Sequence, residues 1–266
     1  MDDLDDKPFL GGSEEEVYER LRGALATAHS LRHGAQLEFV VAPLETGTGY
    51  PMHRISARFS LAVYPFVDGG RGLAPKLLDP DARQAVSQML DRLHSVSPAD
   101  APLARRVPVE VPLRADLERA LEQLNKEWSG GPFAEPTRAL LAVHAPRVRE
   151  MLDTYHRLRA SVESHAGEPV VTHGEPHRRN LIRAADGYLL VDWDTVGLAA
   201  PERDLWMLGD ASGDRDAIDL YRVRWRLDDI SSCVTLLRSV HGNDEDSEKA
   251  LHGLRNSLEA EPFTRD

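Results

Sequence analysis

The stretch that most constrains the fold of this 266-residue chain lies between residues 170 and 205. Inside it, Asp186 and Gly187 separate two short runs rich in apolar residues, at 180–183 and 188–191. An Asp-Gly pair in this setting predicts a tight β-hairpin, because both central positions of the favoured turn require φ > 0. We therefore predict a hairpin whose two-residue turn is formed by residues 186–187.

That turn sets the expected pairing of the two strands. It places Leu181 opposite Asp192 and Asn180 opposite Trp193. Asn180 and Asp192 are then expected about 5–8 Å apart, from ordinary cross-strand geometry. Because Glu175 lies just upstream, the open end of the hairpin is expected to gather one amide and two carboxylates.

This combination of side chains suits phosphoryl transfer. Mg²⁺ takes oxygen ligands, usually one or two from the protein together with the phosphates of a nucleotide. Asn180 and Asp192 offer such oxygens. A carboxylate a few residues before the asparagine, here Glu175, can orient or deprotonate an attacking hydroxyl group.

Two motifs in this stretch resemble those of a known family. Residues 173–180 read HGEPHRRN, and residues 191–194 read VDWD. They are similar to the catalytic and metal loops of aminoglycoside phosphotransferase-like kinases, with the pattern H-G-D-x-x-x-x-N followed by D-W. The segment ERDL at residues 202–205 is similar to one in the spectinomycin phosphotransferase-like branch.

The resemblance implies roles for five residues. Asn180 and Asp192 would bind the metal, and Glu175 would occupy the position of the catalytic base. His173 would be a mainly structural residue of the catalytic loop, with direct chemistry as the alternative. Asp194 would be either a further metal contact or a carboxylate that caps the loop.

The resemblance also implies the cofactors and the fold. ATP would be the phosphoryl donor and Mg²⁺ the metal. Pro65, Phe66 and Val67 would form a hinge whose backbone lies against the nucleotide base, and the alternative is a plain exit from a strand into a loop. The implied fold is α+β and two-lobed, like a protein kinase, with a partial N-lobe at residues 1–68 and a helical C-lobe at 69–266.

The order of predicted elements agrees with that fold. A capping-box pattern begins at Ser13, and apolar periodicity then predicts a helix. Asp204 is expected to cap the helix that follows it. We predict helices at 14–33, 81–94, 114–128, 135–166 (one or two), 204–209, 215–237 (one or a pair) and 251–258, and strands at 39–42, 54–58 and 59–64 besides the central hairpin.

The chain departs from the family pattern at two places. Kinase-like small lobes begin with a Gly-rich hairpin and a strand that bears a lysine, whereas here the first helix is expected at residue 14. An N-terminally short small lobe is therefore expected. Glu175 also stands where the family usually has aspartate, and misplacing a catalytic group can cost on the order of 100-fold in rate.

Composition excludes some classes of function. Acidic side chains outnumber basic ones by 44 to 32, which gives a net charge of −12. This balance argues against a nucleic-acid-binding protein and is compatible with a cationic acceptor such as an amino sugar.

No apolar run reaches the length of a membrane span. The single cysteine, Cys233, fits a reducing cytoplasm and is expected to be a buried residue on a helix.

These observations leave three possible functions. The first is an ATP-dependent kinase for the hydroxyl group of a small molecule, of the aminoglycoside or aminocyclitol type. The second is a catalytically silent kinase-like binding module. The third is a metal-dependent hydrolase built on His173, His177, Asp192 and Asp194. Pro176 argues against the third, because it disfavours the helix that would bring the two histidines together.

Overall fold

The computed structural model describes residues 37–43, 52–54, 59–65, 69–71, 78–101, 104–165, 167–185, 187–193, 195–209 and 212–260. The described residues form two compact units. The first comprises those of Met1–Val86 and Glu175–Val196, and the second those of Ser87–Gly174 and Gly197–Asp266. The predicted helix at 14–33 lies outside the described residues.

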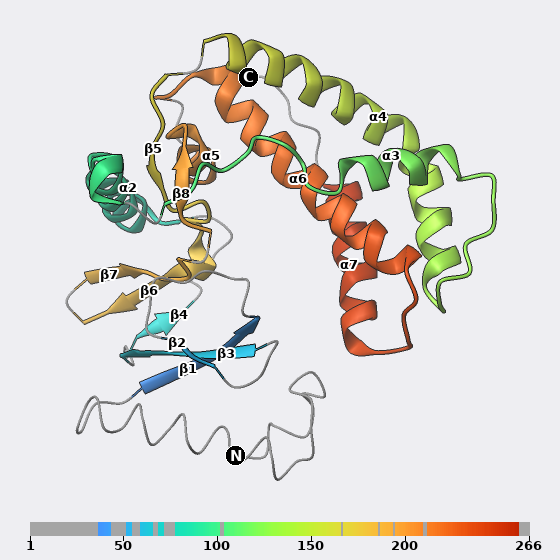
Figure 1. The fold of residues 1–266 in the computed structure, drawn as a ribbon, viewed down its shortest axis with the longest axis horizontal. Helices are drawn as coiled ribbons and strands as arrows, with labels where there is room; N and C mark the ends of the chain where they lie inside the picture. Colours follow the sequence, from blue (N-terminus) through green and yellow to red (C-terminus); the bar gives the residue numbers. More distant parts are fainter. Residues whose placement is uncertain are drawn as a thin grey trace. The chain divides into compact units, whose positions relative to one another are not determined.

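The first unit contains a three-stranded antiparallel sheet. Its strands are β1 (Leu37–Pro43), β2 (Met52–Arg54) and β3 (Phe59–Pro65), in the order β1-β3-β2 (Figure 1). β3 pairs with both neighbours, with Val40 opposite Ala62 and Met52 opposite the same residue on the other side. The predicted strands at 39–42 and 59–64 are confirmed. The strand predicted at 54–58 is observed at Met52–Arg54, and residues 55–58 lie outside the described residues.

A second antiparallel sheet in this unit contains the predicted hairpin. β4 (Gly70–Arg71) pairs with β6 (Leu181–Ala184), and β6 pairs with β7 (Gly187–Leu190). Gly69, just before β4, lies so close to β6 that a Cβ there would be 2.6 Å from the carbonyl oxygen of Arg183. The hairpin is thus joined to the segment that directly follows the predicted hinge.

The predicted register of this hairpin is wrong. Ala184 pairs with Gly187, and Leu181 pairs with Leu190 rather than with Asp192. Each β6 residue therefore faces a partner two positions earlier in the sequence than predicted, as Leu181 does with Leu190 in place of Asp192. Gly187 has a φ of 137°, which glycine adopts readily, and it serves as the first strand residue instead of a turn residue.

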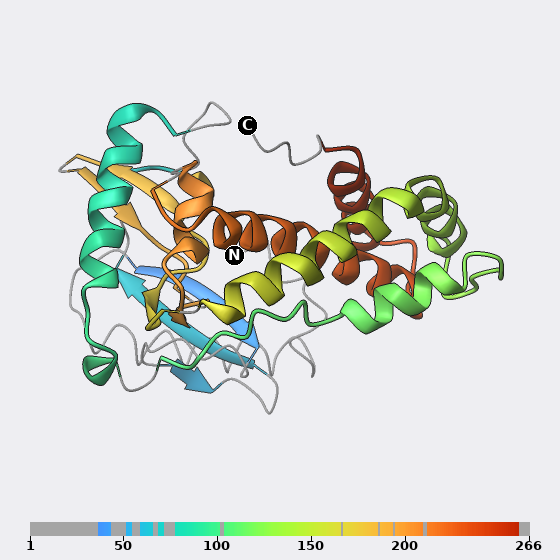
Figure 2. The same ribbon diagram turned by 90° about the horizontal axis from the view of Figure 1, so that it is seen from above.

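The second unit is mainly helical and carries one short sheet. β5 (Val170–Thr172) and β8 (Gly197–Ala199) pair antiparallel, and a bridge from Arg106 to Leu198 extends them. In Figures 1 and 2, α4 lies alongside α6, and α7 packs against both. The helices are α2 (Pro80–His94), which starts in the first unit, α3 (Arg114–Glu122), α4 (Ala134–Ser164), α5 (Glu202–Leu208), α6 (Arg215–Arg238) and α7 (Glu245–Glu259).

The structure decides the two open helix predictions and corrects three others. α3 ends at Glu122 rather than at residue 128, and α5 starts at Glu202 rather than at residue 204. The segment predicted as one or two helices is the single helix α4, with Pro146 inside it, and α6 is one helix rather than a pair. α7 begins at Glu245, whereas its start was predicted at residue 251. Asp244 caps this helix, because its side chain accepts a hydrogen bond from the backbone N–H of Ser247.

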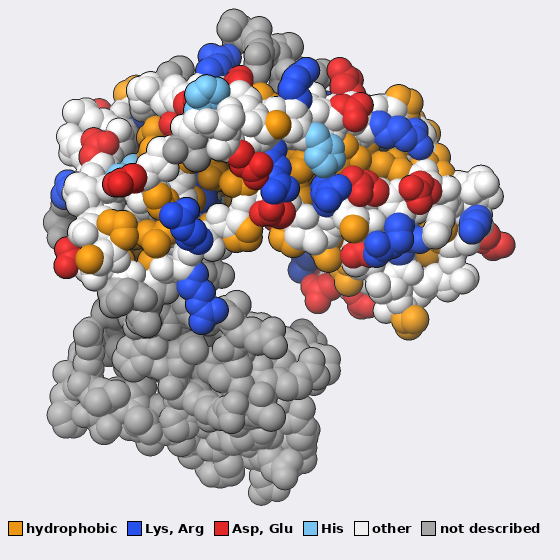
Figure 3. Space-filling view, turned by 45° about the horizontal axis from the view of Figure 1, so that its top comes forward, with side chains coloured by type: hydrophobic (Ala, Val, Ile, Leu, Met, Phe, Trp, Pro, Cys, Tyr) orange, Lys and Arg blue, Asp and Glu red, His pale blue; other side chains and the backbone are white. Residues whose placement is uncertain are grey.

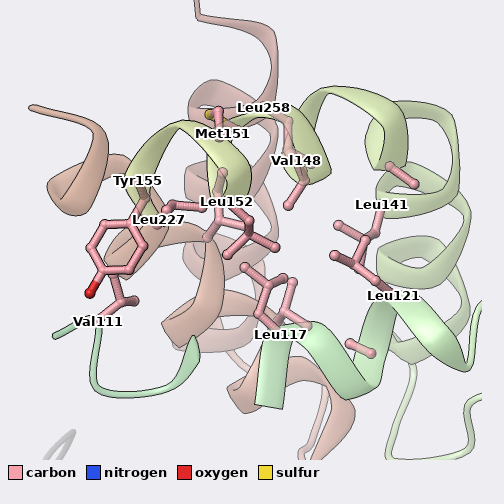
Figure 4. Close-up of a cluster of buried hydrophobic side chains, with 14 of the residues drawn as sticks. Val111, Leu117, Leu121, Leu141, Val148, Met151, Leu152, Tyr155, Leu227 and Leu258 are labelled. Carbon is pink, nitrogen blue, oxygen red and sulfur yellow. The ribbon is translucent and has the colours of Figure 1, made fainter. Parts of the chain in front are cut away.

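The hydrophobic core of the second unit lies between α3, α4, α6 and α7. Figure 4 shows side chains from these four helices meeting, with Leu117, Leu152 and Leu227 among them. Tyr155 is fully buried, and its hydroxyl donates to the carbonyl of Val109 at 3.3 Å. The Pro-rich connection between α2 and α3 is held to the core by this contact.

The surface of the described residues is charged and mixed. In Figure 3, acidic and basic side chains lie interspersed on the face in view. Within the described residues, no helix has the length and apolar character that crossing a membrane requires.

Core truncation is expected to destabilise this unit. Leu117 has no exposed surface, so Leu117→Ala should cost about 2–5 kcal/mol of unfolding free energy through lost burial and a residual cavity. Val143, 76% exposed on α4, is the matched control, and Val143→Ala should change stability by less than about 0.5 kcal/mol. Denaturant unfolding followed by circular dichroism measures both. Equal effects would contradict this assignment of the core.

Cys233 is expected to react slowly in the folded protein. It packs against the core from α6, and burial, aided by the negative charge of Asp229, raises the pKa of its thiol to about 11. At pH 8 its thiolate fraction is then on the order of 100-fold below that of a thiol with an ordinary pKa. Iodoacetamide labelling followed by mass spectrometry should show slow modification of the native protein and rapid modification after denaturation. The structure shows this side chain as partly buried rather than buried as predicted, and equal rates in the two states would refute even this partial shielding.

Candidate functional site

Asn180 is held in a fixed orientation at the entry to the hairpin. It closes the short helical turn Arg178–Asn180, and it is 6% exposed. Its side-chain Nδ2 donates to the carbonyl oxygen of Glu175 at 3.0 Å, and its backbone N–H donates to the carbonyl of His177 at 2.9 Å. Within the described residues no donor contacts its Oδ1, so this oxygen stays available as an acceptor.

Asp192 lies one residue beyond the hairpin partner of Asn180. The backbone N–H of Val191 donates to the carbonyl of Asn180 at 2.9 Å, which extends the pairing to the end of the hairpin. Asp192 has a φ of 70° and is the one non-glycine residue with positive φ in the described part of the chain. Trp193 steadies this reversal, since its indole N–H donates to the carbonyl of Leu190 at 2.9 Å. Such backbone conformations are common at functional sites.

Glu175 lies beside His177 in the first unit. The Oε2 of Glu175 and the Nε2 of His177 are 3.7 Å apart, which is longer than a hydrogen bond. Burial lowers the pKa of His177, and the charges of Arg179 and Arg178 lower it further. The neutral imidazole is therefore favoured next to the carboxylate.

In the second unit, the two residues before Glu175 are held by Asp204. The backbone N–H of His173 donates to Asp204 Oδ2 at 2.9 Å, and that of Gly174 donates to Oδ1 at 2.6 Å. His173 and Asp204 have no exposed surface. The expectation that Asp204 caps the following helix is wrong, because the cap position of α5 is Pro201 and Asp204 lies within the helix.

Arg203 lies against the same backbone turn. Its Nη1 donates to the hydroxyl of Thr172 at 2.8 Å, and this hydroxyl donates to the carbonyl of Gly197 at 2.8 Å. Gly174 has a φ of 98°, and a Cβ there would collide with the guanidinium group of Arg203. The turn therefore requires glycine both for its backbone conformation and for space.

The sequence predicted the ERDL segment as a motif but missed the roles of Arg203 and Asp204. It also missed His94, whose Nε2 lies 2.9 Å from Asp204 Oδ2. Among the predicted hinge residues, Pro65 ends β3, while Phe66 and Val67 lie outside the described residues. Asp194 lies outside them as well.

The described residues hold no group of three or more His, Cys, Asp or Glu side chains arranged to bind a metal ion. Asn180 and Asp192 supply one amide oxygen and one carboxylate. A donor set of this kind suits a hard cation that takes its remaining ligands from water and a nucleotide. The third function, a hydrolase with an all-protein metal site, gains no support from the described residues.

The arrangement of an N-lobe-type sheet, a loop with His-Gly-Glu and Asn, and a hairpin ending in Asp-Trp defines the class of kinase-like phosphotransferases. A family model described as the phosphotransferase enzyme family matches residues 13–233, and the chain belongs to this family. The predicted resemblance to aminoglycoside phosphotransferase-like kinases is thereby confirmed. A search of curated proteins finds no match.

Solved structures support the kinase-like α+β fold. Spectinomycin phosphotransferase APH(9)-Ia in complex with ADP and spectinomycin has a TM-score of 0.67 and 17% identity, over 95% of this chain and 80% of that chain. Its AMP-bound complex has a TM-score of 0.62 and 17% identity, over 76% and 69%.

A side chain at Gly174 is expected to destabilise the turn. Gly174→Ala should cost about 1–3 kcal/mol for its backbone conformation alone, and more because its Cβ meets Arg203. Gly209, with a φ of 67° and open space around its Cβ position, is the matched control that carries the backbone cost only. Denaturant unfolding should show a larger loss for Gly174→Ala than for Gly209→Ala. Equal losses would mean that Arg203 does not restrict this position.

Proposed function

We propose that this protein transfers the γ-phosphate of ATP to a hydroxyl group of a small molecule of the aminoglycoside or aminocyclitol type. One observation carries the proposal. The Nδ2 of Asn180 donates to the backbone carbonyl of Glu175. Across the hairpin, Asn180 pairs with Val191, and Asp192 is the next residue in the chain. An amide oxygen, a carboxylate and a second carboxylate thus belong to one short, hydrogen-bonded segment.

Asn180 and Asp192 would hold Mg²⁺, with Asp194 as a further ligand. The available Oδ1 of Asn180 and the exposed carboxylate of Asp192 fit a hard cation. When bound, the metal would neutralise charge on the phosphates of the nucleotide. The protein groups supply its position, because Asn180 is buried and Asp192 lies on a restrained backbone reversal.

Glu175 would accept the proton of the acceptor hydroxyl as its oxygen attacks the γ-phosphorus, and ADP would leave. Burial lowers the pKa of His177, which disfavours a positive charge next to the Glu175 carboxylate. His173 is fully buried, which favours the structural role expected for it. Glu175 is then the single general base of the mechanism.

The nucleotide base would lie against the backbone of Pro65, Phe66 and Val67, where β3 ends. The similar structure of spectinomycin phosphotransferase contains ADP and spectinomycin, which supports a nucleotide donor and an aminocyclitol acceptor for this chain. The net charge of −12 favours a cationic acceptor. The single cysteine supports a cytoplasmic location.

The test is a transfer assay with γ-labelled ATP, Mg²⁺ and spectinomycin as the acceptor probe. Labelled acceptor should form with the wild type and fall to background with Asp192→Ala, which removes the carboxylate ligand. Glu175→Gln, which keeps the shape but not the basicity, should lower kcat by about 10²–10⁴-fold. Asp246→Ala, at an exposed position of α7, is the control and should leave the rate unchanged.

A silent kinase-like module is the alternative outcome of the same experiment. Binding of ATP and Mg²⁺ without transfer to any of a panel of amino sugars and aminocyclitols, and without ATP hydrolysis, would favour it. Absence of nucleotide binding at millimolar ATP would refute the kinase function.

A further inference from the structure

The Asp204 carboxylate is fully buried and accepts three hydrogen bonds. Two come from the backbone N–H groups of His173 and Gly174, at 2.9 and 2.6 Å. The third partner is His94, whose Nε2 lies 2.9 Å from Oδ2. Among the described residues, His94 is the one side chain that donates to Asp204. The pair joins α2 to α5 across 110 residues of sequence.

His94 satisfies a carboxylate that has no access to water. Its side chain is 13% exposed and that of Asp204 is 0% exposed. Burying a carboxylate is costly unless its oxygens are hydrogen-bonded. Oδ2 is shared between His94 and the N–H of His173, so the imidazole also fixes the rotation of the carboxylate. In that rotation Oδ1 is left to accept from Gly174.

We propose that His94 is a positioning residue, which holds Asp204 in the orientation that fixes the backbone of His173 and Gly174. Gly174 is bonded directly to Glu175, so the conformation of this turn sets the direction in which the chain enters the base position. The catalytic part of this proposal rests on the proposed function. Neither the motif at 173–180 nor the motif at 191–194 contains His94, and no metal ligand or base assignment includes it.

Without the imidazole, Asp204 keeps only its two backbone donors. A buried carboxylate left in this state relaxes towards water or another donor, and its hold on the two amides weakens. A displacement of the turn by a fraction of an ångström then reaches Glu175 through one peptide bond. Misplacement on the scale of 1 Å costs on the order of 100-fold in rate.

The first measurement is amide hydrogen exchange at His173 and Gly174, and it needs no activity. His94→Leu removes the donor at similar size, whereas His94→Gln keeps an N–H donor near the position of Nε2. Exchange at both amides should speed up about 10-fold or more in His94→Leu and stay within about threefold of wild type in His94→Gln. His252→Leu, at an exposed position of α7, is the control and should have no effect there.

The second measurement is steady-state phosphoryl transfer by the same variants. His94→Leu should lower kcat by about 10–100-fold while the KM for ATP changes less than about twofold, and His94→Gln should restore most of kcat. A residue that only stabilises the fold would lower the amount of active protein, and the glutamine variant would not selectively rescue turnover.

The outcomes separate the two proposals. Unchanged exchange in His94→Leu overturns the role of His94, as does equal damage by leucine and glutamine. Faster exchange with unchanged kcat overturns the positioning role as well. If the wild type transfers no phosphate, the proposed function fails, and the exchange data alone then support or overturn the anchoring of the turn by His94.

Discussion

The buried Asp204 carboxylate is the interaction on which the site segment depends. A fully buried charge is tolerated only with several good donors, and here the donors are two backbone amides and one imidazole. Because both amides are consecutive, they must point the same way, and this requires a sharp turn at Gly174 with its φ of 98°. The hydrogen bonds that offset the cost of burying this carboxylate also order the backbone that leads into Glu175.

Arg203 completes this arrangement from the neighbouring position of the same helix. Its guanidinium occupies the space where a side chain at position 174 would lie, and it donates to Thr172 at the end of β5. Arg203 and Asp204 therefore hold three consecutive residues, Thr172, His173 and Gly174. A two-residue sequence on α5 thus defines the chain path just before the candidate base, while the candidate metal ligands are held separately by the hairpin in the first unit.

The sequence predicted what is encoded locally. The helices at 81–94 and 215–237 were found because their apolar periodicity and end signals lie within one segment. The hairpin was found from Asp186 and Gly187, yet its register was missed, since a glycine with a φ of 137° can start a strand as well as form a turn. The start of α7 at Glu245 was not predicted, because its first turn is acidic and shows no apolar periodicity. The aspartate at 244 is nevertheless a residue type that favours the N-cap position.

What the sequence could not predict was long-range. The hydrogen bond from His173 to Asp204 spans 31 residues, and that from His94 spans 110. No local pattern marks His94 as different from the other histidines of the chain. Asp204 was predicted to cap a helix, a common role of an aspartate near a helix start. In the structure it accepts hydrogen bonds from the backbone of His173 and Gly174 instead. The motifs therefore predicted the family but not the long-range hydrogen bonds that hold the site segment in place.

The backbone of Glu175, the base on the proposed function, is held by the same contacts. Glu175 follows Gly174, whose backbone is fixed by Asp204 and Arg203, and precedes the buried Pro176. Proline locks its own φ and restricts the residue before it to extended conformations. The carbonyl of Glu175 is also held, by Asn180. The backbone at this position is therefore held from both sides, by the turn at Gly174 and by Asn180. On the proposed function, this held backbone sets where the Glu175 side chain meets the acceptor hydroxyl.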